Sequence, residues 1–109
     1  MSTTSWPQAE PSDGEGIIGN QVVVHNPARY ADYAARGRAA MALHGGRILA
    51  AGGHVETLEG EPIPARVVII EFPSREDALA YYHSPEYQAA RVARGDAATV
   101  RFALVDGLA

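Results

Sequence analysis

Residues 66–72 read RVVIIEF, the clearest β-strand pattern in the chain, and Pro73 ends the run. Side chains alternate between the two faces of a strand, so both faces of this one are largely apolar. One face carries Val67, Ile69 and Glu71, and the other carries Val68, Ile70 and Phe72. Because helices in a small antiparallel fold cover only one sheet face, the other needs a different cover. The simplest cover is the same sheet of a second copy, which predicts a homodimer packed sheet against sheet.

Other strands and helices are predicted on both sides of this run. Short β-branched or apolar segments predict strands over residues 17–25, 47–58 and 99–106. Gly52 and Gly53 interrupt the second of these strands, which indicates a bulge or a sharp bend. N-cap residues followed by helix-forming segments predict helices over residues 26–44, 74–83 and 85–94.

The first of these helices has the clearest amphipathic pattern. Apolar and aromatic residues recur at three- and four-residue steps and predict its buried side: Tyr30, Tyr33, Ala34, Gly37, Met41 and His44. Asn26 is expected to cap the start and Gly45 to end the helix in a left-handed conformation. In the second helix, Ser74 is expected to cap the start with Asp77 as its partner.

The order of elements is β-α-β-β-α-(α)-β, two related β-α-β halves. This order predicts an α+β fold of the ferredoxin-like type, with a four-stranded antiparallel sheet and helices on one face. The domain is expected over residues 17–109, after a flexible tail at 1–16 that is rich in Ser, Pro, Gly and acid. Trp6 in that tail is expected to be a disordered or loosely docked aromatic; the alternative is that it packs on a partner subunit or covers a cleft.

Composition excludes several classes of function. The chain has 109 residues, enough for one domain, and its net charge of −4 argues against a nucleic-acid surface. Its nine basic residues are all arginine, which rules out a lysine Schiff base, and the absence of cysteine rules out disulfides and thiolate metal sites. With no secretory signal and no apolar run of membrane-spanning length, a cytoplasmic location away from membranes is the default expectation.

Four short segments resemble a bacterial family known as domain of unknown function 1330, DUF1330. They are a GGR turn at 45–47, LEG at 58–60, IEFPS at 70–74 and YxSPEYQ at 82–88. The resemblance covers nearly all of the chain after the tail, from Ile17 to Leu108. Family members usually begin close to the first strand, so the tail is extra. They usually have Asp-Pro where this chain has Asn26-Pro27, and either residue can cap a helix.

The resemblance implies the dimeric α+β barrel superfamily, in agreement with the fold and the dimer expected from the residues. That superfamily includes cofactor-independent monooxygenases, isomerases, cyclases, dehydratases and haem enzymes, so the fold does not select an activity. The resemblance also implies a pocket inside each subunit, between the sheet and the helices.

Glu71, His25 and Arg47 are the candidate catalytic residues. Glu71 ends an otherwise apolar strand, where loss of solvent would suit a general base; the alternative is an ion pair with Arg47 or Arg66. His25 ends a strand and could also act as a base. Arg47 follows the Gly-Gly turn and could bind a substrate carboxylate or stabilise an oxyanion, or instead pair with Glu59 or Glu71.

The candidate substrate-binding residues combine apolar bodies with polar tips, as a flat, partly polar ligand would require. They are Tyr30, Tyr33, Tyr82, Ser84 and Arg66. For the tyrosines the alternative is a half-buried place in the core, and Tyr82 is favoured over Tyr81 because it lies in the family-like segment. The four histidines have no metal-ligand spacing, so no metal is predicted, and haem binding through His25 or His83 is a minor alternative.

These observations support two hypotheses of different classes. The first is a small cofactor-independent enzyme of catabolism or secondary metabolism that removes a proton from an oxygenated hydrophobic molecule, as an isomerase, cyclase, dehydratase or monooxygenase does. The second is a non-catalytic dimeric module that binds a small ligand or a protein. An interior without a cavity, with Glu71 in an ion pair with an arginine, would favour the second hypothesis.

Overall fold

The computed structural model describes residues 14–63 and 66–108. In this part of the chain the strands are β1 (Gly16–Val24), β2 (Arg47–Ala51), β3 (Arg66–Phe72) and β4 (Ala98–Asp106). The helices are α1 (Pro27–Ala42), α2 (Arg75–His83) and α3 (Pro85–Arg94). Trp6 and most of the expected tail lie outside the described residues, and β1 begins at Gly16, the last position assigned to that tail.

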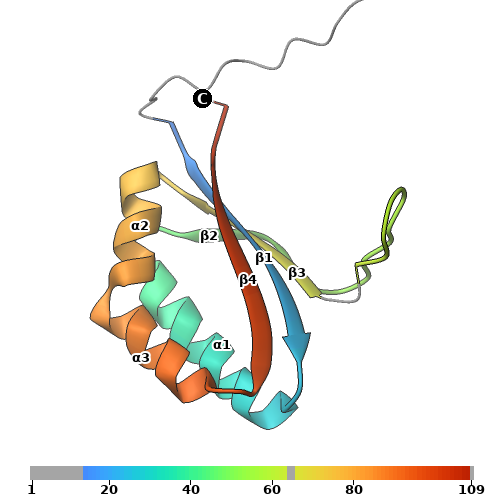
Figure 1. The fold of residues 1–109 in the computed structure, drawn as a ribbon. Coiled ribbons are helices and arrows are strands. Elements are labelled where there is room, and N and C mark those ends of the chain that lie inside the picture. The colour runs from blue at the N-terminus through green and yellow to red at the C-terminus, as the bar shows by residue number, and fades with distance from the viewer. Residues whose placement is uncertain (1–13, 64–65, 109) are drawn as a thin grey trace, which may run out of the picture.

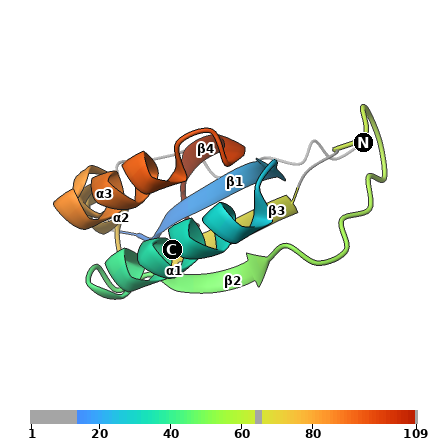
Figure 2. The same cartoon turned by 90° about the horizontal axis from the view of Figure 1, so that it is seen from below.

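The strands form one antiparallel sheet in the order β2-β3-β1-β4. Figure 1 and Figure 2 show the helices together on one face of this sheet. The expected α+β fold with a four-stranded antiparallel sheet is therefore confirmed. None of the described helices is long and apolar enough to cross a membrane.

Side-chain caps begin the helices where the sequence predicts them. Asn26 accepts from the backbone N–H of Arg29 at 3.1 Å, and Ser74 accepts from the N–H of Asp77 at 3.0 Å. Helix α1 ends two residues before the predicted His44, and Gly45 then has the expected positive φ of 74°. These caps determine where α1 and α2 start, and so which side chains meet the sheet.

The second strand is shorter than the sequence predicts, because β2 ends at Ala51 instead of near Leu58. Gly52 and Gly53 have φ values of 73° and 71°, which turn the backbone out of the extended conformation, and the Gly52 N–H makes a last bond to the Val67 carbonyl of β3 at 2.8 Å. The irregularity in the ladder lies between Ile48 and Ala50 rather than at the glycines. Residues 52–63 then project away from the sheet and helices (Figures 1 and 2).

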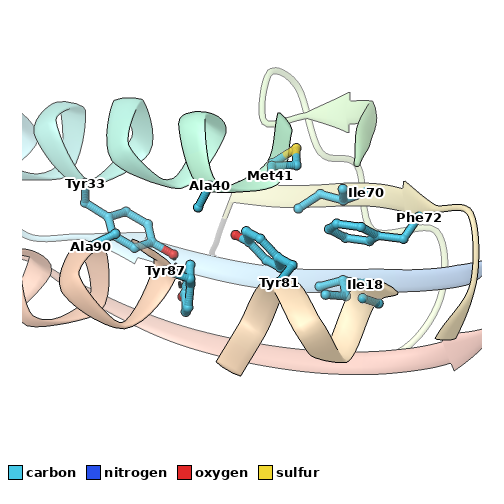
Figure 3. Packing of buried hydrophobic residues seen from close by; sticks show 10 residues of the cluster. Ile18, Tyr33, Ala40, Met41, Ile70, Phe72, Tyr81, Tyr87 and Ala90 are labelled. Atoms are coloured by element: carbon cyan, nitrogen blue, oxygen red, sulfur yellow. Dashed lines mark hydrogen bonds between the residues drawn. The ribbon is translucent and has the colours of Figure 1, made fainter. Parts of the chain in front are cut away.

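The core lies between the helices and one face of the sheet. Figure 3 shows the Tyr33 ring reaching from α1 toward Tyr87 of α3, with Ile70 and Phe72 entering from β3. The buried cluster consists of Ile18, Tyr33, Ala40, Met41, Ile70, Phe72, Ala78, Tyr81, Tyr87 and Ala90. Even-numbered positions of β1 and β3 therefore face the helices, and odd-numbered positions form the opposite face, which we call the open face.

Candidate functional site

A cavity of about 170 Å³ lies between α1 and the sheet. Its walls come from α1, from β1, β2 and β3, and from one residue of α2. The lining residues are Asn20, Tyr30, Tyr33, Ala34, Gly37, Arg38, Met41, Ile48, Ala51, Arg66, Val68, Ile70 and Tyr81. An apolar cavity of about 150 Å³ can hold benzene, so this space suits one substituted ring.

Asn20 is the polar residue at the base of this cavity. It faces the helices from β1, between the buried apolar residues Ile18 and Val22, and it is 8% exposed. Its amide oxygen is buried and has no hydrogen-bond partner among the described residues. A buried acceptor without a donor is uncommon, because its lost hydration is not replaced. The oxygen itself is closed to solvent in this conformation, so a ligand hydroxyl or N–H would reach it once the Asn20 side chain turns toward the cavity.

Two arginines stand at the rim of the cavity. The guanidinium carbon of Arg66 lies 5.5 Å from the centroid of the Tyr30 ring, a cation–π contact. Burial raises the pKa of the Tyr30 phenol, and the positive charge and hydrogen bond of Arg66 oppose that rise. Arg38 lies on the exposed side of α1 and also lines the cavity. The rim thus carries positive charge beside an aromatic wall.

Two buried tyrosines, Tyr33 and Tyr81, belong to the cavity wall. The hydroxyls of Tyr33 and Tyr87 lie 2.8 Å apart and join α1 to α3 outside the wall. Burial raises the pKa of Tyr87, and the neighbouring Tyr33 raises it further. Burial also raises the pKa of Tyr81, whose hydroxyl lies beside Gly37 of α1. Tyr81 and Tyr87 therefore stay protonated at neutral pH.

The structure brings three of the predicted substrate-binding residues together: Tyr30, Tyr33 and Arg66 all line the cavity. Tyr82 lies elsewhere, in a second hollow of about 280 Å³ between α2 and the sheet. The Ser84 hydroxyl donates to the carbonyl of Tyr81 at 2.7 Å and accepts from the N–H of Tyr87 at 3.1 Å. Its hydrogen bonds are thus used to cap α3.

The predicted catalytic residues do not line this cavity. Glu71 and Arg47 are cross-strand partners on the open face, where their side chains form an ion pair at 2.9 Å. The ion pair weighed from the sequence is therefore present, and the sheet separates Glu71 from the cavity. His25 follows β1, is exposed and contacts the Thr99 hydroxyl at 2.8 Å. The catalytic roles of these three residues remain predictions without a place in the cavity.

Sequence reasoning missed Asn20, Arg38 and Tyr81. Asn20 had a detectable signal, because it is the polar member of an otherwise apolar set at alternating positions, with Ile18 and Val22. Arg38 had none, since an arginine on a helix surface is ordinary. Among the described residues, no three His, Asp or Glu side chains come close enough together to hold a metal ion.

The model of one protein family, described as Domain of unknown function (DUF1330), matches residues 17–108. The chain belongs to the DUF1330 family. This membership confirms the resemblance of the sequence segments and covers all of the described fold from the second residue of β1. No curated protein shows significant sequence similarity to this DUF1330 chain.

Solved structures share the fold of this DUF1330 chain at low sequence identity. A protein of unknown function from Rhodopseudomonas palustris is 23% identical with a TM-score of 0.69, over 90% of this chain and 85% of that one. SnoaB, a cofactor-independent oxygenase from Streptomyces nogalater, is 20% identical with a TM-score of 0.62, over 88% and 95%. A proposed antibiotic biosynthesis monooxygenase from Caulobacter crescentus is 15% identical with a TM-score of 0.59, over 88% and 92%. At these identities the likeness establishes the fold alone.

Proposed function

We propose that this protein is a small cofactor-independent enzyme whose substrate, an oxygenated ring compound, binds in the cavity between α1 and the sheet. The observation that carries the proposal is that Asn20, a residue of the cavity wall, has a buried amide oxygen with no partner among the described residues. A polar group kept unsatisfied inside a fold costs stability, so its retention indicates a use. The fold shared with SnoaB, named as a cofactor-independent oxygenase, agrees with this class of reaction.

The cavity could stabilise the anion formed in a reaction that begins with loss of a proton; the described wall has no carboxylate or imidazole, so the proton would pass to solvent water. Removing a proton from a phenol, or from carbon next to a carbonyl, leaves negative charge on a substrate oxygen. The Arg66 guanidinium beside Tyr30 would stabilise that charge, and Asn20 would hold a second oxygen of the ring in place. Isomerisation, cyclisation, dehydration and oxygenation all share this first step.

Binding can be tested with Asn20→Leu, which keeps the branched shape and the number of side-chain heavy atoms and removes the polar amide. The matched control is Gln21→Leu, the next residue of β1, which is exposed on the open face. We expect single-ring phenols and cyclic diketones to raise the melting temperature of the native protein and of the control but not of Asn20→Leu. Equal binding by Asn20→Leu would contradict the proposal.

Turnover is tested on the ligands found in this way, by their ultraviolet spectra and by oxygen consumption. Tyr33→Phe and Arg66→Gln should lower kcat/KM, and Gln21→Leu should leave it unchanged. A ligand that binds in the cavity but is never converted would favour the second hypothesis, a binding module. The ion pair between Arg47 and Glu71 is the structural observation on the side of that hypothesis.

We also propose that a second copy of the chain covers the open face. Apolar side chains of β1 and β3, including Ile17, Val67 and Ile69, lie on this face opposite the helices, and the described chain covers them only in part. A pair of open faces brought together would bury them. Light scattering should give twice the chain mass for the native protein. Ile69→Glu should give a monomer, whereas Val92→Glu on the exposed side of α3 should stay dimeric; a monomeric native protein would contradict this.

A further inference from the structure

The charged side chains that line the cavity are all positive. Arg38 and Arg66 both line the cavity, and no Asp or Glu appears among the described residues of its wall. Four other arginines each pair with a carboxylate: Arg29, Arg36, Arg47 and Arg75. Arg38 and Arg66, like Arg91, Arg94 and Arg101, have no such partner within residues 14–63 and 66–108, and of these five only Arg38 and Arg66 line the cavity. The rim therefore holds two positive charges that the described fold does not neutralise.

Gly52, directly after β2, leaves room for the Arg66 side chain. A Cβ atom built on Gly52 would lie 3.2 Å from Cγ of Arg66 and 3.4 Å from its Cδ. The bare backbone of Gly52 thus lets the aliphatic stem pass close by, and the guanidinium ends over the Tyr30 ring. This packing holds the guanidinium over Tyr30 at the cavity, although Arg66 is exposed to solvent and its charge is therefore sensitive to salt.

Arg66 and Asn20 enter the same cavity from neighbouring strands. Asn20 pairs across the sheet with Val68, and Val22 pairs with Arg66, so Asn20 and Arg66 are diagonal neighbours on the same face. The backbones of diagonal neighbours lie about 7–8 Å apart. Both side chains can therefore contact one ligand in the cavity that they line. The cavity of about 170 Å³ has room for one substituted ring.

No proton acceptor stands beside the ligand space. The titratable groups of the described wall are tyrosines and arginines, with no carboxylate or imidazole. Burial raises the pKa of Tyr81 and, against the opposing effect of Arg66, that of Tyr30, so neither is a base at neutral pH. A ligand that enters already ionised suits such a wall better than one that must lose its first proton inside.

We propose that the cavity is selective for an anion, a hydroxylated aromatic carboxylate, with its carboxylate against Arg66 and Arg38 and its ring hydroxyl donating to Asn20. This inference rests on the proposed function, because it names the substrate class of the same cavity. The planar guanidinium fork matches the two oxygens of a carboxylate. The hydroxyl of the ligand is recognised by Asn20, because it supplies the hydrogen-bond donor that the buried amide oxygen lacks.

Three probes of similar size separate the charge from the hydroxyl. They are 4-hydroxybenzoate, its neutral analogue 4-hydroxybenzamide, and benzoate, which lacks the hydroxyl. Titration calorimetry on the full chain at neutral pH should give the tightest binding for 4-hydroxybenzoate. Removing the charge or the hydroxyl should each weaken binding by about tenfold or more, the usual size of such losses. Added salt should weaken binding of the acid and leave the amide unaffected.

Variants of the two arginines then test which of them binds the carboxylate of the ligand. Arg66→Gln should weaken 4-hydroxybenzoate binding by about tenfold to a hundredfold and change 4-hydroxybenzamide binding by less than about twofold. Arg38→Gln should produce a smaller loss. The control is Arg91→Gln, an exposed arginine of α3 that contacts Gln88 and lies outside the cavity wall. Circular dichroism of each variant checks that the fold is kept.

The outcomes separate this inference from the proposed function. Equal binding of the amide and the acid, with no effect of Arg66→Gln, would overturn the anion selectivity while leaving the cavity as a ligand site. Failure of all three probes, while neutral phenols still bind in an Asn20-dependent way, would overturn the carboxylate class alone. Failure of every ring compound to bind would overturn the proposed function as well.

Discussion

The guanidinium of Arg47 lies 2.9 Å from the carboxylate of Glu71, where β2 pairs with β3 on the open face of the sheet. The cavity lies on the other face, lined by Ile70 from the same strand. Glu71, the strongest candidate base from the sequence, and the cavity contents are therefore separated by the sheet itself. This arrangement makes the role of Glu71 directly testable.

We expect Glu71→Gln to leave ligand binding in the cavity unchanged and to lower the free energy of unfolding by no more than about 1 kcal/mol. The side chains of Arg47 and Glu71 are 71% and 28% exposed, and ion pairs at such positions contribute little. Urea denaturation and calorimetry measure the two effects. A loss of turnover with stability and binding unchanged would restore Glu71 as a catalytic residue.

Replacing Asn20 should stabilise the protein while it removes ligand binding. Its buried amide oxygen lacks a partner among the described residues, so Asn20→Leu should raise the free energy of unfolding by about 1–3 kcal/mol. Urea denaturation without ligand measures this gain, and Arg91→Gln on the exposed side of α3 should change stability by less than about 0.5 kcal/mol. A destabilised Asn20→Leu would mean that the amide makes a structural hydrogen bond.

The hydroxyl pair of Tyr33 and Tyr87 should behave as one unit. Tyr33→Phe and Tyr87→Phe should each cost about 1–2 kcal/mol, because each leaves the other buried hydroxyl without its partner at 2.8 Å. The double variant should lose less than the sum of the two, with a coupling of about 0.5–1.5 kcal/mol in a double-mutant cycle. Additive losses would show that the two hydroxyls do not stabilise one another.

Stability should fall as the pH rises above about 10, the ordinary pKa of tyrosine. Burial raises the pKa of Tyr81 and Tyr87 in the folded chain, so above pH 10 the folded state holds protons that the unfolded state has lost. The free energy of unfolding then decreases with pH, by up to about 1.4 kcal/mol per pH unit for each tyrosine. Below pH 10 both states are protonated and these groups have no effect.

The chain is well suited to this measurement because it contains no lysine and no cysteine, so tyrosines are the side chains that titrate in this range. Urea denaturation between pH 9 and about 11 should show the decrease, and Tyr81→Phe should make it shallower. Arg47→Gln, which removes a charge on the open face, should leave the slope unchanged. An equally steep decrease in Tyr81→Phe would show that other groups cause it.

Most of the fold could be predicted because its signals are local. Asn26, Ser74 and Ser84 begin the helices through hydrogen bonds to N–H groups three residues away, so neighbours in sequence suffice to identify them. The end of β2 was harder to predict. A pair of glycines is compatible with a bulge inside a strand or with a turn that ends it, and only the positive φ angles at Gly52 and Gly53 distinguish the two.

The candidate site was predictable only in part. Tyr30, Tyr33 and Arg66 were identified because aromatic and arginine side chains suit a ligand wherever they face it. Arg38 and Tyr81 were missed because nothing near them in the sequence sets them apart from ordinary surface and core residues. Their place in the wall depends on how α1 and α2 lie against the sheet.

The sequence by itself determined the order of the elements, the helix caps and the two apolar faces of β3, since these follow from periodicity and from residues a few positions apart. Only the tertiary structure decided which face the helices cover. Ile70 and Phe72 are buried against the helices, and Glu71 is thereby left on the open face beside Arg47. Strand alternation separates side chains into two sets, but long-range packing decides which set lines the cavity.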